Sequence, residues 1–185
     1  MITKILHYII FDLEATCWEQ RGKIEDMEII EIGAVKMEPS SFNILSEFQS
    51  FIKPINNPVL SDFCIKLTSI TQQQIDTAKN FKEVFPHFID WIGNDSFQIC
   101  SWGEYDLNQL RVDCQRHSIM LPDIIEKNHR NLKAEFALLF NQKPCGMKRA
   151  LKHLKINSEG IHHRGIDDAR NIAKIAQVML PKFIS

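Results

Sequence analysis

The sequence predicts an α/β domain in which helices flank a mixed central β-sheet. Two observations lead to this fold class. Three strand-like runs with short polar turns fill the first third of the 185 residues, and helical segments alternate with strand-like ones afterwards. Short connections favour antiparallel neighbours, whereas strands joined through helices can add in parallel. Hydrophobic residues make up 44% of the chain and charged residues 24%, as in ordinary globular proteins, so we expect residues 1–185 to form one domain.

The first three strands are marked by apolar runs bounded by polar turn residues. We expect a central strand at residues 7–13, a second strand at 28–37 and a third at 44–52. The run at 7–13 is almost wholly apolar, which suits the buried centre of a sheet.

Helical signals begin after residue 70. Thr71 with Gln74 fits a capping box, and Asn80 with Glu83 fits a second one that opens an amphipathic helix reaching Ile92. The remaining elements are expected in this order: a strand at 96–102, a helix at 105–117, a short strand at 129–132, a helix through 136–140, and helices at 147–154 and 167–180. Pro181 is expected to end the last helix, because proline cannot continue it.

Two carboxylates interrupt the first strand. Asp12 and Glu14 stand two residues apart, so their side chains project from the same face of the strand. Burying two like charges side by side is costly, and a cation held between them is the simplest explanation. The pair is therefore a candidate metal site for a hard cation.

Three later residues could complete this site. Asp106 follows the strand at 96–102, Asp168 lies in the first turn of the last helix, and His163 lies in a loop between Gly160 and Gly165. Taken singly, each acid fits the N-terminus of a helix, where the dipole favours negative charge, and the histidine fits an ordinary surface position. Their combination with the paired carboxylates points to a shared site instead.

Three motifs that contain these residues resemble a known family. The segments FDLEATC, SWGEYDLNQL and HRGIDDARNIA are similar to the motifs of the DEDDh 3′–5′ exonucleases, over residues 8–180. The strings LSDFC and LTSIT, at 60–64 and 67–71, narrow the likeness to one branch. That branch contains the eukaryotic histone-mRNA and small-RNA exonucleases and bacterial KapD-like proteins.

The resemblance implies a ribonuclease H-like fold and a site with two Mg²⁺ or Mn²⁺ ions. The implied metal ligands are Asp12, Glu14, Asp106 and Asp168, and the implied catalytic residues are Glu14 and the general base His163. Asp167 is the wrong member of the final acidic pair, because one helical step turns it about 100° away.

The chemistry of these residue types agrees with that assignment. Two cations about 4 Å apart can stabilise the attacking and leaving oxygens of a phosphodiester. Carboxylate oxygens suit Mg²⁺ and Mn²⁺ better than zinc. Histidine titrates near neutrality, which suits a general base, and flanking glycines would let His163 move when substrate binds.

The resemblance also implies contacts with a single-stranded substrate. Phe63 and Tyr105 would stack on the terminal base, the backbone at Ala15 and Thr16 would approach the terminal sugar, and Leu67 and Ile70 would wedge against the base. His163 would also touch the substrate. For Phe63, burial in the core is an equally good alternative, and for Leu67 and Ile70 it is a serious one.

The densest basic stretch of the chain is Lys148, Arg149, Lys152 and Lys155. Such a run usually forms a solvated helix face, but here it could follow the incoming phosphates together with Arg164. If it does, substrate affinity should depend steeply on salt.

The sequence departs from the family pattern in three places. Ser69 stands where relatives often have glycine, Tyr105 stands where the histone-mRNA enzymes have tryptophan, and Gly103-Glu104 is inserted before the third acid. Because no nucleic-acid-binding domain precedes the motifs, we do not expect the stem-loop recognition of the larger eukaryotic relatives.

The predicted function is a metal-dependent 3′–5′ exonuclease that releases nucleoside 5′-monophosphates from single-stranded nucleic acid, with RNA favoured over DNA. The alternatives are a DNA exonuclease of the repair or proofreading type and a non-catalytic regulatory module on a nuclease fold. The net charge is −1, so nucleic-acid binding would need a local patch or bound metal. Five scattered cysteines and no long apolar run predict a cytoplasmic protein without a membrane segment.

Overall fold

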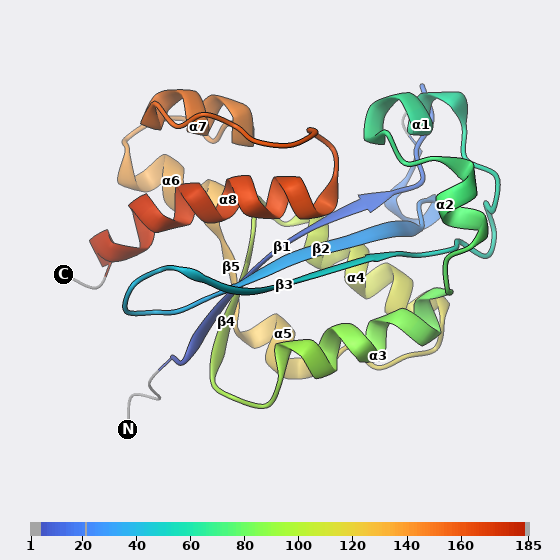
Figure 1. The fold of residues 1–185 in the computed structure, drawn as a ribbon, viewed down its shortest axis with the longest axis horizontal. Helices are drawn as coiled ribbons and strands as arrows, with labels where there is room; N and C mark the ends of the chain where they lie inside the picture. Colours follow the sequence, from blue (N-terminus) through green and yellow to red (C-terminus); the bar gives the residue numbers. More distant parts are fainter. Residues whose placement is uncertain (1–4, 21, 184–185) are drawn as a thin grey trace.

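The predicted mixed sheet is present in the computed structural model, which describes residues 5–20 and 22–183. Within these residues a five-stranded sheet has the order β3-β2-β1-β4-β5 (Figure 1). Its strands are β1 (His7–Ala15), β2 (Ile29–Met37), β3 (Ile44–Phe51), β4 (Phe97–Ser101) and β5 (His129–Asn131). Strand β1 lies at the centre, antiparallel to β2 and parallel to β4, as the sequence predicted.

Most helices also lie where the sequence placed them. They are α1 (Asp62–Thr68), α2 (Gln72–Asp76), α3 (Phe81–Ile92), α4 (Tyr105–Arg116), α5 (Asp123–Lys127), α6 (Leu132–Leu139), α7 (Met147–Leu154) and α8 (Gly165–Met179). Helices α1 and α5 were not predicted, because each is too short to show helical periodicity. The capping boxes at Thr71 and Asn80 are confirmed.

The ends of the last helix differ from the prediction. Helix α8 begins at Gly165 rather than Asp167, and the chain continues past it through Pro181 in a 3₁₀ turn, Leu180–Phe183. A second 3₁₀ turn, Ile24–Asp26, precedes β2 and was not predicted. No helix in the described part of the chain is long and apolar enough to cross a membrane.

The alternation of β1 decides which layer each of its side chains enters. Tyr8 and Ile10 pack into the core formed with α6, α7 and α8, whereas Ile9 and Phe11 pack into the opposite core, formed with α3 and α4. Because side chains alternate along a strand, Asp12 and Glu14 continue the face of Tyr8 and Ile10. They therefore face the layer that contains the start of α8.

A close backbone contact fixes the start of α8 on the sheet. A Cβ at Gly33 of β2 would lie 2.0 Å from the carbonyl carbon of Gly165, so only glycine allows this approach. Gly33 is the antiparallel partner of Asp12. The contact therefore brings the first turn of α8, with Asp168, next to the paired carboxylates.

An ion pair between Arg164, just before α8, and the fully buried Glu31 of β2 holds the same junction. The guanidinium of Arg164 donates to both carboxylate oxygens of Glu31, at 3.0 and 3.2 Å, and the N–H of Gly165 donates to Glu31 Oε2 at 3.0 Å. Arg164 also lies over the ring of Phe51. Because the guanidinium of Arg164 is paired with Glu31 and only 15% exposed, the structure argues against a role for Arg164 in following incoming phosphates.

Candidate active site

The predicted acids meet in one cleft. Asp12 and Glu14 of β1 and Asp168 of α8 each offer a carboxylate oxygen, and these three oxygens lie within 4.8 Å of one another. Asp106 of α4 lines the same cleft, whose volume is about 570 Å³, but stands outside that tight group. Its Oδ1 accepts a hydrogen bond from the backbone N–H of Leu13 at 3.1 Å, which ties α4 to β1 between the paired carboxylates.

Three of the clustered acids have pKa values well above those of ordinary carboxyl groups. Burial raises the pKa of Asp12 well above its usual range, and the neighbouring charges of Asp106 and Glu14 raise it further. The pKa of Glu14 is raised by burial and then by Asp168. Burial also raises the pKa of Asp106 to about 6, against the opposing hydrogen bond from Leu13.

This arrangement fits a divalent cation. Clustered carboxylate oxygens are the ligands that Mg²⁺ and Mn²⁺ prefer, and a cation among them would offset the cost of burying these charges together with their mutual repulsion, the two causes of the raised pKa values. Asp167 does not join the cluster: its carboxylate accepts from the N–H of Ile161 at 2.9 Å and pairs with Arg170, as its helical position predicted.

Two histidines, not one, reach the site. His163 and His162 both line the cleft, and their rings lie 3.9 Å apart. His162 Nδ1 lies 3.0 Å from Asp168 Oδ2, whereas His163 donates its backbone N–H to the same oxygen at 3.0 Å. His162 was not among the residues predicted for the site. Its position beside His163 in one loop was the available signal.

The surroundings of His163 suit a proton acceptor. Burial and the adjacent His162 lower its pKa below 6.5, although Asp168 opposes this. The ring is therefore mostly neutral at pH 7, with a nitrogen free to take a proton. His163 also has φ = 64°, a left-handed conformation that places it on a sharp turn just before α8.

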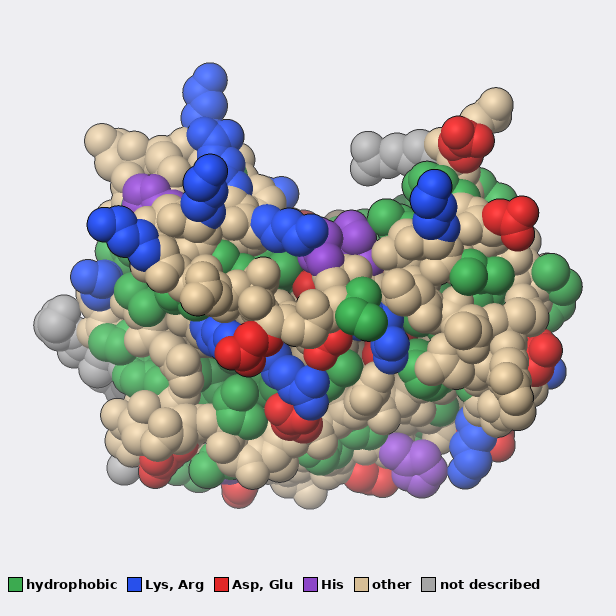
Figure 2. Space-filling view, turned by 45° about the horizontal axis from the view of Figure 1, so that its top comes forward, with side chains coloured by type: hydrophobic (Ala, Val, Ile, Leu, Met, Phe, Trp, Pro, Cys, Tyr) green, Lys and Arg blue, Asp and Glu red, His purple; other side chains and the backbone are tan. Residues whose placement is uncertain are grey.

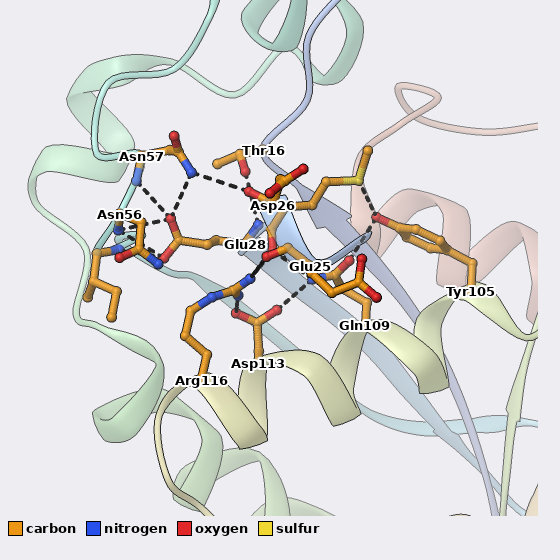
Figure 3. A network of polar contacts seen from close by, with 12 residues as sticks. Thr16, Glu25, Asp26, Glu28, Asn56, Asn57, Tyr105, Gln109, Asp113 and Arg116 are labelled. Carbon is orange, nitrogen blue, oxygen red and sulfur yellow. Dashed lines mark hydrogen bonds and ion pairs between the residues drawn. The ribbon is translucent and has the colours of Figure 1, made fainter. Parts of the chain in front are cut away.

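Tyr105 forms one side of the cleft mouth and is held by its hydroxyl. Its side chain is 41% exposed and lines the cleft. The hydroxyl lies 3.2 Å from Gln109 Oε1, one helical turn along α4, and 3.4 Å from Met27 Sδ (Figure 3). A tryptophan at this position would have no hydroxyl for that tether.

The tether is part of a larger polar network that fastens the 25–28 segment to α4. Gln109 donates to the carbonyl of Met27 at 3.0 Å and to Asp113 at 2.7 Å. Arg116 donates to the carbonyls of Glu25 and Met27 at 2.6 and 2.8 Å (Figure 3). Because each donor has a partner, the network fixes the orientation of the Tyr105 ring.

The other predicted substrate contacts lie farther from the acids or are buried. Phe63 and Leu67 are exposed on α1, but neither lines the cleft. Ala15 and Thr16 are buried at the end of β1, and the N–H of Thr16 donates to the Glu28 carbonyl at 2.8 Å. Their proposed contacts with substrate stay predictions.

The prediction that Ile70 wedges against the base is wrong for this structure. Its side chain has no exposed surface and packs with Leu60, Cys64 and Ile75 in a small core cluster under α1 and α2. The preceding Ser69 ends α1 in a left-handed conformation, φ = 59°. That conformation favours glycine, which gives the glycine of related sequences a physical reason.

The family model and two relatives that match this chain are those of exonucleases. The model of a family described as RNase_T, exonuclease, matches residues 9–176. ERI1 exoribonuclease 2 of Xenopus laevis is 35% identical over 94% of this chain, and 3′-5′ exoribonuclease 1 of Homo sapiens is 33% identical over 92%. The chain spans 28% of the length of the first relative and 51% of the second.

Solved structures give the same likeness in three dimensions. The nuclease domain of 3′hExo, a DEDDh family member bound to rAMP, has a TM-score of 0.89 and 31% identity, covering 96% of this chain and 93% of that one. A 3′-exonuclease structure concerned with 3′-end specific recognition of the histone mRNA stem-loop has a TM-score of 0.90 and 29% identity, covering 97% and 65%. These likenesses confirm the predicted ribonuclease H-like fold and the histone-mRNA branch.

Proposed function

Since the chain belongs to the RNase_T family of exonucleases, in its DEDDh group, we propose that it removes nucleotides from the 3′ end of single-stranded RNA. The observation that carries this proposal is the convergence of Asp12, Glu14 and Asp168 in a cleft that also holds Asp106 and His163. A regulatory module that had lost catalysis would not need to keep five buried or half-buried polar groups in this costly arrangement.

The DEDDh exonucleases depend on divalent metal. We propose that two Mg²⁺ or Mn²⁺ ions are held here by Asp12, Glu14, Asp106 and Asp168. When bound, the ions would stabilise the negative charge on the reacting phosphate and on its attacking and leaving oxygens. The raised pKa values of Asp12, Glu14 and Asp106 support this, because a nearby cation would favour the ionised form of each acid.

Residues of the 160–165 loop, α8 and α4 would supply the proton transfer and the contact with the base. His163 takes the proton from the water that attacks the phosphate, which its neutral ring can do at pH 7. Asp168 holds the turn that carries His163 through the backbone N–H of that residue. The ring of Tyr105 offers a face on which the terminal base can stack.

RNA is the preferred substrate in this proposal because of the relatives. ERI1 exoribonuclease 2 and 3′-5′ exoribonuclease 1, which match across more than 90% of this chain, are named as exoribonucleases, and one similar structure was solved with rAMP. The product would be a nucleoside 5′-monophosphate, since the terminal phosphate stays with the released nucleotide. A cytoplasmic location and a single catalytic unit over residues 1–185 remain part of the proposal.

The test is a direct assay with matched substrates. A 5′-labelled single-stranded RNA and the DNA of the same sequence are incubated with Mg²⁺, with Mn²⁺ or with EDTA, and the products are separated by length and by chromatography. We expect stepwise shortening from the 3′ end with metal only, and loss of activity in Asp12→Ala and His163→Ala. Equal rates on both polymers would remove the RNA preference, and a wholly inactive chain would favour a binding module.

A further inference from the structure

Helix α7 presents two chemically different faces. Met147, Ala150 and Leu151 are buried in the core that α7 shares with α8. The spacing of these residues leaves Lys148, Arg149 and Lys152 exposed on the side away from that core. Lys155, which caps the helix in a left-handed conformation, is exposed as well. We call these four residues the basic face.

The charges of the basic face are not neutralised within the protein. Among the described residues, no carboxylate lies within ion-pair distance of Lys148, Arg149, Lys152 or Lys155. The other described arginines are paired: Arg111 with Glu126, Arg116 with Asp113, Arg130 with Glu135, Arg164 with Glu31, and Arg170 with Glu47 and Asp167. In a chain of net charge −1, this face is therefore a local excess of positive charge.

The basic face is continuous with the active-site cleft. Lys148 and Arg149 line the cleft that contains the acids, and the charge of Lys148 acts on His163. Lys148 also lines a second hollow of about 460 Å³, together with Lys152 and Lys155. Figure 2 shows basic side chains gathered on one flank of a surface hollow, with histidine side chains at its floor.

We propose that the basic face binds the phosphates of the nucleotides that lie 5′ to the one being removed, so that the strand leaves the cleft along α7 from Lys148 towards Lys155. The inference rests on the proposed function, because it takes the 3′ end to lie at the acids. Single-stranded nucleic acid fits better than an acidic peptide, because the positive charge begins inside the cleft that would hold the reacting phosphate.

The geometry sets the length of this track. Positions 148 to 155 span about 10 Å at a rise of 1.5 Å per residue. A stacked strand advances about 3.4 Å per nucleotide, so the track accommodates about three nucleotides. Three lysine contacts predict that the logarithm of affinity falls with the logarithm of salt at a slope of about −2, from a factor of 0.7 for each phosphate of a single strand.

The test removes two of these charges without touching the cleft. In Lys152→Gln/Lys155→Gln both side chains are exposed, so the fold should persist. The matched control is Lys79→Gln/Lys82→Gln, which removes the same charge from exposed positions at the start of α3, on the opposite layer. Binding of a ten-nucleotide RNA is measured by fluorescence anisotropy across a salt series with Mg²⁺, in a His163→Ala background that slows hydrolysis by at least about 100-fold.

We expect the salt slope to fall by about 1.4 in the α7 variant, which weakens binding about 25-fold at 0.1 M salt if the curves meet near 1 M. The control should keep the slope of the parent. Equal slopes in the α7 variant, the control and the parent would overturn the proposal.

A second readout separates this inference from the proposed function. In the active background, the α7 variant should lose a similar factor in kcat/KM on the ten-nucleotide RNA. It should keep its rate on the p-nitrophenyl ester of a nucleoside 5′-monophosphate, which has no phosphate to reach α7. Equal losses on both substrates would refute the proposal that the basic face binds the phosphates of the longer strand. If the parent cleaves neither, the proposed function fails, and the salt slopes still decide whether the basic face binds RNA.

Discussion

Neutralising Asp106 should stabilise the metal-free protein and abolish its activity. The residue is only 5% exposed, and burial raises its pKa to about 6. Asparagine keeps the size of the side chain and the oxygen that accepts from the N–H of Leu13. Asp106→Asn therefore removes the charge while leaving that hydrogen bond in place.

The expected gain follows from the pKa difference. An unfolded aspartate titrates near 3.9, so a folded pKa of about 6 corresponds to roughly 2 units, or about 3 kcal/mol lost by the native state once the group is ionised. Because the folded pKa is the higher one, the stabilising contribution of Asp106 is complete below about pH 4 and lost as pH rises through 6. The advantage of Asp106→Asn should grow over that interval and level off above it.

Denaturant or thermal unfolding in EDTA at several pH values measures this difference. At pH 8 the variant should melt about 6–12 °C above the parent, and near pH 4 the two should coincide. Added Mn²⁺ should raise the melting temperature of the parent more than that of the variant, which has lost a ligand. A variant that is equally or less stable than the parent at pH 8 in EDTA would refute the electrostatic account of the site.

Substitutions at four further positions test other parts of the structure. His163→Ala should lower kcat by about 10²–10⁴-fold, whereas His162→Ala should keep most of the activity, and the reverse order would reassign the base. Tyr105→Phe keeps the ring but loses the hydroxyl tether, so KM should rise by a small factor with kcat unchanged, while Tyr105→Ala should raise KM much further; equal effects would show that the tether alone matters. Gly33→Ala should destabilise the protein by about 1–3 kcal/mol or more, measured by urea unfolding, because its Cβ would meet Gly165 at 2.0 Å, and a neutral result would contradict that contact.

Much of the fold could be predicted because its signals are local. The strand runs, the capping boxes at Thr71 and Asn80 and the helical period of α3 are all set by neighbours within a few residues. The short helices α1 and α5 were missed because they contain too few turns to show a period. Ile70 was misassigned because an apolar residue at a domain surface and one in a core look the same in a sequence.

The site likewise combines features that the sequence predicts with contacts that only the structure shows. Asp12 and Glu14 could be placed on one face of a central strand from their spacing, and motif order identified Asp106, His163 and Asp168 with them. The i,i+4 spacing of Tyr105 and Gln109 permits the tether but does not show which partner the hydroxyl takes, and the side-chain contact of His162 with Asp168, at 3.0 Å, depends on the conformation of the 160–165 loop. Other contacts of the site join distant segments, such as Gln109 with the carbonyl of Met27 and Arg164 with Glu31, and only packing brings those segments together.

The sequence by itself determined the mixed α/β sheet, the acids and histidine that make the site, and the family to which the chain belongs. The tertiary structure decided which charged residues are available to a substrate. Arg164 lies next to His163 in the chain but is paired with Glu31, whereas Lys148, Lys152 and Lys155 stay unpaired beside the cleft. The reason is physical: a charge is free or neutralised according to its neighbours in space, and those neighbours come from strands and helices far away in the sequence.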